Sequence, residues 1–140
     1  MFAIKIASTE RDILSCWNCI FALRPMLEKK DIIALIKKQQ AEGYNLLYIE
    51  DDSGMQAIAG YRIFSMLHTG KQLYIDDLST LQSSRGKGYG TALLQHIYEI
   101  AKKNNCKTVQ LDSGPTRTIA HKLYLNENFT INSLHFGKML

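Results

Sequence analysis

The chain of 140 residues is 46% hydrophobic and 21% charged, with a formal net charge of +4 and an isoelectric point near 9.0. These values are typical of a globular protein. They exclude an intrinsically disordered chain and the dense positive charge of a dedicated nucleic-acid binder. Every apolar stretch is broken by polar residues well before the roughly 20 residues that a membrane-spanning helix needs. We expect a cytoplasmic protein with one domain over residues 1–140, without nucleic acid or membrane as partner.

The first part of the chain predicts a strand followed by two helices. Residues 2–7 alternate apolar and polar side chains as a half-buried strand does. A hydroxyl cap at residues 8–9, with acidic residues in the turn that follows, opens a helix that reaches about residue 23. Pro25 ends that helix, and an apolar stripe predicts a second helix over residues 27–41.

From residue 46 onward, the apolar side chains follow a period of two residues. Alternating segments joined by polar turns predict consecutive antiparallel strands over residues 46–49, 55–66 and 72–81. The segment from residue 73 to residue 111 reads strand, glycine-rich loop, helix, strand, which implies a parallel pair. The last elements are a helix ending near residue 105, a strand over 108–111, a helix over 116–125 and strands over 129–131 and 134–136. The order β-α-α-β-β-β-α-β-α-β-β predicts an α/β domain of the mixed α+β kind, with a mixed and mostly antiparallel sheet.

Two of the three cysteines have the spacing of a redox C-x-x-C motif, Cys16-Trp17-Asn18-Cys19. A redox pair lies at the start of a helix that follows a strand, where the helix dipole lowers the pKa of the first thiol. Here the pair falls inside an amphipathic helical pattern, and no second ligand pair completes a zinc site. We therefore interpret both cysteines as reduced, buried packing residues.

Three alternate glycines, Gly86, Gly88 and Gly90, lie between a predicted strand and a predicted helix. Glycine permits positive φ and close approach of a ligand to the backbone, and the N–H groups of such a turn converge on an anion at a helix N-terminus. Arg85 and Lys87 add formal positive charge. The segment therefore predicts a phosphate-binding loop.

Two common phosphate loops fit this segment poorly. A Walker A loop requires Ser or Thr after its Lys, whereas Gly88 follows Lys87. A Rossmann loop requires G-x-G-x-x-G directly after the strand, whereas the pattern here is G-x-G-x-G and residues 82–85 intervene. Asp112, at the end of the next strand, does lie where a ribose-binding acid would. The opening pair of helices and the three-strand meander nevertheless disfavour a Rossmann fold.

Arg85-x-x-Gly88-x-Gly90 resembles the [RQ]-x-x-G-x-[GA] pyrophosphate loop of the GNAT acetyltransferases. The segment from Ala120 to Tyr124, with Phe129 after it, is similar to that family's A-x-x-[LF]-Y…G-F segment, and the order of elements agrees over essentially the whole chain. The resemblance implies a GNAT-like acyl-CoA N-acyltransferase fold with helices on both faces of the sheet. It also implies an N-acetyltransferase that moves an acetyl group from acetyl-CoA to a primary amine by direct attack in a ternary complex, without a metal.

Two positions depart from the family pattern. The Asn that often precedes the Ala by three residues is Arg117 here, which leaves open whether the usual contact to coenzyme A is replaced. The Gly before the Phe is Asn128, a residue type that can still adopt the left-handed conformation that a turn requires.

The resemblance also assigns the cofactor-binding residues. In this family the fourth strand separates from the fifth at a bulge and pairs with pantetheine, a role that falls by position on Leu78, Ser79 and Thr80, with the Leu78 N–H as candidate oxyanion donor. The pyrophosphate loop comprises Arg85, Gly86, Lys87, Gly88, Tyr89, Gly90 and Thr91. Tyr124 lies where the family has the phenol that protonates the coenzyme A thiolate.

We select Asp76 as the general base, so that Tyr124 and Asp76 are the two predicted catalytic residues. Strand alternation predicts that Asp76 shares a face with Leu78, which faces the thioester in this scheme, and that Asp77 lies on the other face. A carboxylate acts on the amine through water, because its ordinary pKa is far below that of an ammonium group. The other candidate bases are Asp77, Glu50, Asp112 and His135. The same acids are also candidates for recognising a cationic acceptor.

The acceptor pocket is expected around residues 17–27 and 44–61. A small amine, a polyamine, an aminoglycoside-like compound and a protein lysine are all open as acceptors, and so is a homodimer as assembly. Two further function classes stay open, namely a non-catalytic acyl-CoA or nucleotide-binding module and a Rossmann-like dinucleotide binder.

Overall fold

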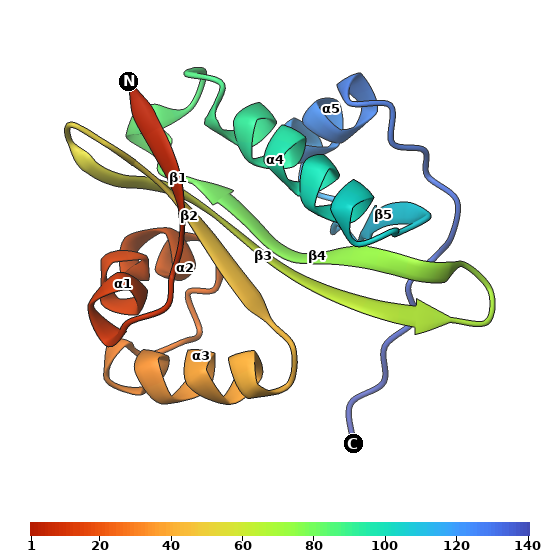
Figure 1. The fold of residues 1–140 in the computed structure, drawn as a ribbon, viewed down its shortest axis with the longest axis horizontal. Helices are drawn as coiled ribbons and strands as arrows, with labels where there is room; N and C mark the ends of the chain where they lie inside the picture. Colours follow the sequence, from red (N-terminus) through yellow and green to blue (C-terminus); the bar gives the residue numbers. More distant parts are fainter.

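The computed structural model describes residues 1–140 and has a five-stranded sheet between two layers of helices (Figure 1). The strands lie side by side in chain order: β1 (Phe2–Ile6), β2 (Asn45–Asp51), β3 (Gly54–Met66), β4 (Gly70–Thr80) and β5 (Thr108–Leu111). Neighbouring strands are antiparallel except β4 and β5, which are parallel as the crossover predicted. None of the helices combines the length and the apolar composition that crossing a membrane requires.

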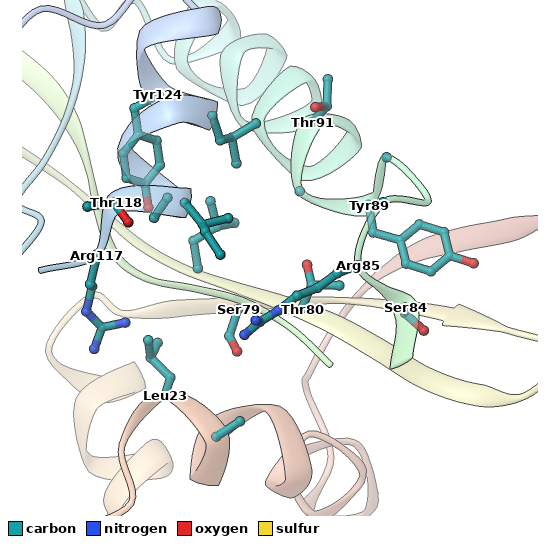
Figure 2. Close-up of a pocket in the computed structure, with 18 of the residues that line it drawn as sticks. Leu23, Ser79, Thr80, Ser84, Arg85, Tyr89, Thr91, Arg117, Thr118 and Tyr124 are labelled. Carbon is teal, nitrogen blue, oxygen red and sulfur yellow. The ribbon is translucent and has the colours of Figure 1, made fainter. Parts of the chain in front are cut away.

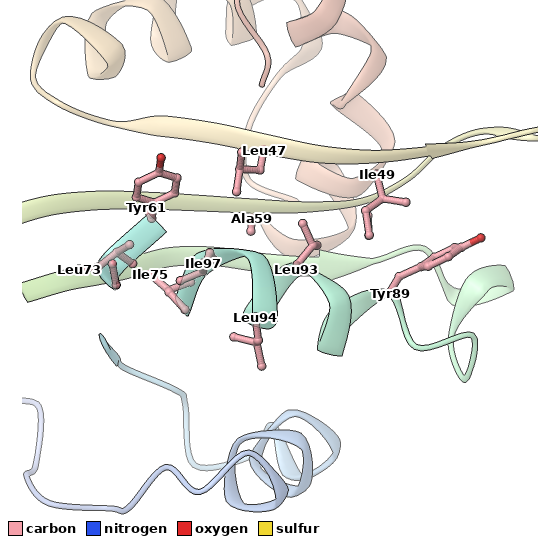
Figure 3. Packing of buried hydrophobic residues seen from close by; sticks show 12 residues of the cluster. Leu47, Ile49, Ala59, Tyr61, Leu73, Ile75, Tyr89, Leu93, Leu94 and Ile97 are labelled. Carbon is pink, nitrogen blue, oxygen red and sulfur yellow. The ribbon is translucent and has the colours of Figure 1, made fainter. Parts of the chain in front are cut away.

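One layer is formed by the three early helices and the other by the two late ones (Figure 1). The early layer comprises α1 (Glu10–Ser15), α2 (Trp17–Leu23) and α3 (Ile32–Ala41), and the late layer α4 (Tyr89–Lys103) and α5 (Thr118–Asn126). Each face of the sheet has its own apolar core. Leu93 and Ile97 of α4 pack against Ala59 and Ile75 of the sheet (Figure 3).

The helix predicted over residues 10–23 is interrupted at Cys16, and its start is capped by Thr9 as expected. The Asp12 N–H donates to Thr9 Oγ1 at 3.1 Å, and the Thr9 N–H donates to Asp12 Oδ2 at 3.1 Å. Further along, the Ser15 hydroxyl donates to the Asp12 carbonyl at 2.6 Å, which is the acceptor that the Cys16 N–H has in a regular helix. The Cys16 N–H bonds to the Ile13 carbonyl instead, so α1 ends there and α2 begins.

The second predicted helix also starts later than expected, at Ile32 and not at residue 27. Residues 24–27 form a turn that contains Pro25, and Glu28 is extended with φ −111°. A single 3₁₀ turn, Lys29–Asp31, leads into α3. The apolar pattern in this part of the chain gave no sign that residues 27–31 belong to the connection between α2 and α3.

Cys16 and Cys19 are buried and form no disulfide, which confirms their interpretation as packing residues. Burial raises the pKa of both thiols to about 12. A redox motif requires a thiol whose pKa is lowered.

The two strands predicted over residues 129–131 and 134–136 are wrong. The chain after α5 contains no strand, and residues 131–140 are exposed, including the side chains of Leu134 and Phe136. Alternation specifies a strand only where a neighbouring strand offers hydrogen-bond partners and one face is covered. Residues 131–136 pair with no strand of the sheet, and their side chains are exposed.

Candidate functional site

A cavity of about 600 Å³ lies where β4 ends and α4 begins (Figure 2). Its walls come from five elements that are far apart in the sequence: α2, β4, the glycine loop, α4 and α5. The residues of our prediction that line it are Leu78, Ser79, Thr80, Arg85, Gly86, Gly88, Tyr89, Gly90, Thr91 and Tyr124. The fold therefore brings together most of the residues that the sequence assigned to cofactor binding.

The end of β4 leaves one of its edges unpaired beside this cavity. β4 pairs with β3 from Gly70 to Thr80, but with β5 only from Gln72 to Ile75. Residues 76–80 therefore have no strand on the β5 side, and Leu78, Ser79 and Thr80 line the cavity there. This is the separation of the two strands that we expected, and it exposes backbone groups that can pair with an extended ligand.

The glycine loop turns a set of backbone N–H groups away from protein acceptors. Gly86 and Gly88 both have a φ of +83°, which residues with a side chain rarely adopt. Gly88 caps α4, and its carbonyl accepts the Ala92 N–H at 2.9 Å. The N–H groups of Gly86 and of residues 88–91 donate to no protein acceptor. Free N–H groups at the positive end of a helix dipole are the arrangement that binds anions in other proteins, and here they lie at the mouth of the cavity.

Tyr124 reaches into the same cavity from α5, with its hydroxyl directed inward (Figure 2). Its ring packs edge-on against Phe129 at 5.8 Å between centroids. Burial raises the pKa of Tyr124, and the charge of Arg117 partly opposes that shift. The phenol is therefore protonated at neutral pH and can donate a proton.

A family model described as the acetyltransferase (GNAT) family matches residues 8–129 of this chain. The chain belongs to the GNAT family. A relative from Bacillus subtilis (strain 168), the uncharacterized N-acetyltransferase YhdJ, is 36% identical over 100 residues, which are 71% of this chain and 70% of that protein. Both findings support acyltransferase activity.

Solved structures with low sequence identity share the fold. A ribosomal-protein-alanine N-acetyltransferase from Brucella melitensis biovar Abortus 2308 has a TM-score of 0.84 at 15% identity, over 100% of both chains. A transcriptional regulator from Bacillus halodurans C-125 has a TM-score of 0.83 at 18% identity, again over 100% of both chains. These likenesses confirm the predicted α/β fold of the GNAT kind.

Two members of the predicted loop act differently from the rest. Lys87 does not line the cavity, and its N–H bonds to the Ser84 carbonyl at 3.4 Å. The Tyr89 ring points away from the cavity (Figure 2), and its hydroxyl donates to Asp51 Oδ2 at 2.6 Å. Tyr89 thus anchors the start of α4 to the end of β2, and its contribution to the cavity comes from its backbone and not from its hydroxyl.

A bulge in β4 corrects our prediction for the aspartates. Gly60 pairs with Asp77 and Tyr61 pairs with Ile75, so Asp76 is an extra residue without a partner on β3. The bulge interrupts the strand alternation. Asp77 bonds to Tyr44 of the α1–α3 face, whereas Ile75 and Leu78 pack in the core of the α4 face. Asp76 and Asp77 therefore face the same side, and the shared face predicted for Asp76 and Leu78 is wrong.

Both aspartates lie in ion pairs that the sequence did not reveal. Asp77 accepts Arg24 Nε at 3.1 Å on Oδ1 and the Tyr44 hydroxyl at 2.7 Å on Oδ2. Asp76 accepts Arg62 Nε at 2.7 Å on Oδ2. Burial raises the pKa of Asp76, and Arg62 opposes that shift. Bonds between residues so distant in the chain have no local signal.

The remaining candidate bases lie elsewhere. Glu50 pairs with Lys5 at 3.5 Å, and Asp112 accepts the Tyr74 hydroxyl and faces His135 Nδ1 at 3.6 Å. None of Glu50, Asp112 and His135 lines the cavity at the glycine loop. Arg117 does line it, as do Leu23 of α2 and Ser84 of the turn after β4, two residues that the motifs did not select.

Proposed function

We propose that the protein is an acetyl-CoA-dependent N-acetyltransferase that moves the acetyl group to a primary amine by direct attack in a ternary complex. The observation that carries this proposal is the convergence of three features on one cavity. They are the unbonded N–H groups of the glycine loop, the unpaired edge of β4 and the hydroxyl of Tyr124. Membership of the GNAT family supports the same reaction.

The chemistry of the cavity fits acetyl-CoA. The N–H groups of Gly86 and of residues 88–91 suit the pyrophosphate, and Arg85 and Arg117 on the cavity wall add two guanidinium groups for the phosphates. The unpaired edge of β4 at residues 77–80 suits the two amides of pantetheine, as an added strand would. The thioester then lies near Leu78, whose N–H is our candidate donor to the carbonyl oxygen.

In the transfer, the neutral amine nitrogen attacks the thioester carbonyl carbon, so that a C–N bond forms and the C–S bond breaks. Tyr124 donates its hydroxyl proton to the departing sulfur. The nitrogen loses a proton through water to Asp76, whose raised pKa makes it a stronger base than an exposed aspartate. Asp76 passes that proton to solvent, and Tyr124 takes a proton from solvent. The products are the acetylated amine and coenzyme A with its free thiol, and no net proton is released from the neutral amine.

Thiol release from acetyl-CoA over a panel of primary amines tests the activity, with calorimetry of coenzyme A binding beside it. The variant Gly88→Trp is expected to lose both, because its side chain strains a backbone with φ +83° and fills the loop. Coenzyme A binding without thiol release from any amine would contradict the enzyme and support a non-catalytic acyl-CoA-binding module. Failure to bind coenzyme A would contradict both.

A further inference from the structure

The glycine loop between β4 and α4 has few hydrogen bonds of its own. Between residues 85 and 88, only the N–H groups of Arg85 and Lys87 have a protein acceptor, at 3.3 Å and 3.4 Å. A Cβ added to Gly86 or to Gly88 would meet no atom within 4 Å, so no other part of the chain packs on the loop there. The shape of the loop therefore depends on what holds its two ends.

A buried pair of side chains holds the first end of the loop. Ser84, directly before Arg85, is 2% exposed, and its hydroxyl donates to Oε1 of Gln56 on β3, which is 6% exposed. The Gln56 amide nitrogen donates to the Gly54 carbonyl at 3.2 Å, which leaves Oε1 for Ser84. The Gln56 carbonyl accepts the Leu81 N–H at 2.9 Å. Gln56 thus bonds to both ends of the turn that leads from β4 into the loop.

A second side-chain bond holds the other end of the loop. The Tyr89 hydroxyl donates to Asp51 Oδ2 at 2.6 Å, and the other oxygen of that carboxylate accepts the Ser53 N–H at 2.8 Å. Asp51 ends β2 and Gln56 lies near the start of β3, so both belong to one hairpin. Ser84 and Tyr89, at either end of residues 85–88, are thus tied to the same hairpin (Figure 2).

The polar pair of Gln56 and Ser84 contributes geometry more than stability. Burial removes water from both groups, and the bond between them offsets about that loss, so an apolar pair would stabilise the fold as well. A bonded pair, however, admits one arrangement. Ordering a loop costs conformational entropy, most of all at glycine. A loop that is already ordered in the free protein binds its ligand more tightly, because binding no longer carries that cost.

We propose that Gln56 and Asp51 are positioning residues, which hold the glycine loop in the shape that binds the pyrophosphate of coenzyme A. They act through the hydroxyl groups of Ser84 and Tyr89. The inference rests on the proposed function for the identity of the ligand. Neither Gln56 nor Asp51 lines the cavity, so their effect on the cofactor passes through the loop. Pantetheine, which we place on the unpaired edge of β4, is expected to bind independently of both bonds.

The test measures the affinity for coenzyme A by calorimetry in Gln56→Met and Tyr89→Phe, which each remove one bond and keep most of the side-chain volume. We expect the Kd to rise about 3- to 10-fold in each variant, since the net contribution of one hydrogen bond sets that limit. The Kd is expected to rise further in the double variant, because the two bonds hold different ends of the loop.

Matched controls remove similar bonds away from the loop. Gln72→Met replaces a glutamine on β4 that is 2% exposed, has both amide atoms bonded and does not line the cavity. Tyr98→Phe removes a hydroxyl that bonds to Glu127 outside the cavity. Both controls are expected to bind coenzyme A as the wild type does, whatever stability they lose.

A shorter acetyl donor separates positioning from a general loss of structure. S-acetylpantetheine keeps the thioester and both amides but has no pyrophosphate. In Gln56→Met we expect a higher KM for acetyl-CoA with kcat unchanged, and an unchanged kcat/KM for S-acetylpantetheine. Ser84→Ala tests the same bond from its donor side. It is expected to weaken coenzyme A binding as much as Gln56→Met does, and the two changes together are expected to have no larger effect than either alone.

The outcomes separate this inference from the proposed function. Coenzyme A affinity in Gln56→Met, Ser84→Ala and Tyr89→Phe within twofold of the wild type overturns the inference and leaves the enzyme standing. An equal loss in Gln72→Met, or an equal loss with S-acetylpantetheine, also overturns it, since the effect would then come from stability. Coenzyme A binding that depends on both bonds, without acetylation of any amine, supports the inference and contradicts the enzyme. No binding of coenzyme A by the wild type contradicts both.

Discussion

The ring of Tyr44 lies directly on the backbone of Gly60, so that a Cβ added to Gly60 would overlap the Tyr44 hydroxyl and ring. This close approach lets Tyr44 cross β3 and donate its hydrogen bond to Asp77, the partner of Gly60 on β4. The guanidinium of Arg62 stacks over the same ring at 5.4 Å. A glycine in the middle of a strand thereby leaves room for the Tyr44 ring between Asp77 and Arg62.

We expect Gly60→Ala to lower the free energy of unfolding by about 1–3 kcal/mol, because the new methyl group displaces Tyr44 in a packed core. Chemical denaturation measures the change. Gly137→Ala is the control, since Gly137 lies in the exposed C-terminal segment with nothing within 4 Å of an added Cβ. Equal unfolding midpoints for the two variants would show that Tyr44 has room to move.

Gly88→Ala is expected to weaken coenzyme A binding about tenfold or more. An alanine at φ +83° costs about 1–2 kcal/mol in backbone strain and turns the loop N–H groups away from the anion. The matched control is Gly54→Ala, which has a φ of +102° and open space in the β2–β3 turn. Gly54→Ala should lose similar stability but bind coenzyme A normally. Loss of binding in both variants would mean that the effect comes from stability alone.

Tyr124→Phe is expected to lower kcat about 100-fold with the KM for acetyl-CoA little changed, because a general acid contributes roughly that factor and the ring still fills its place. Steady-state kinetics measure both constants. Tyr98→Phe is the control, since Tyr98 also packs on Phe129 but does not line the cavity. A fall in kcat no larger than that of the control would remove Tyr124 from the mechanism.

Asp76→Asn is expected to unfold at a higher temperature than the wild type at pH 7. Burial raises the pKa of Asp76 in the folded state, so its protonated form is favoured on folding. The associated stability is fully present below the ordinary pKa of about 3.9 and is lost as the pH rises through the higher folded value. Melting curves should therefore converge at acid pH and separate toward neutrality. A variant less stable than the wild type at pH 7 would show that the bond to Arg62 outweighs burial.

Native protein is expected to react with a thiol reagent at one cysteine only. Burial raises the pKa of Cys16 and Cys19 to about 12 and removes them from solvent, whereas Cys106 is half-buried. A colorimetric disulfide reagent should thus titrate one thiol before and three after denaturation, and none in native Cys106→Ser. Fast reaction of a second native thiol would revive the redox interpretation of Cys16 and Cys19.

The sequence by itself determined the features that depend on neighbouring residues. The loop at residues 85–91 needs glycines at positive φ to point its N–H groups outward, and alternate glycines before an amphipathic helix reveal that need locally. The strand at residues 108–111, the cap at Thr9 and the crossover between parallel strands follow from short patterns as well.

Tertiary structure decided what depends on partners far away in the chain. An extra residue in β4 turned Asp76 to the side of Asp77, and only the register with β3 reveals it. The alternating residues after α5 pair with no strand of the sheet and stay exposed. A cavity of about 390 Å³ exists because α2, α3 and β4 meet there. Asp76 Oδ1 is buried without a hydrogen bond because Arg24 and Tyr44 bond to Asp77 and Arg62 bonds to the other oxygen of Asp76. Hydrogen bonds and packing across such distances leave no periodicity in the sequence.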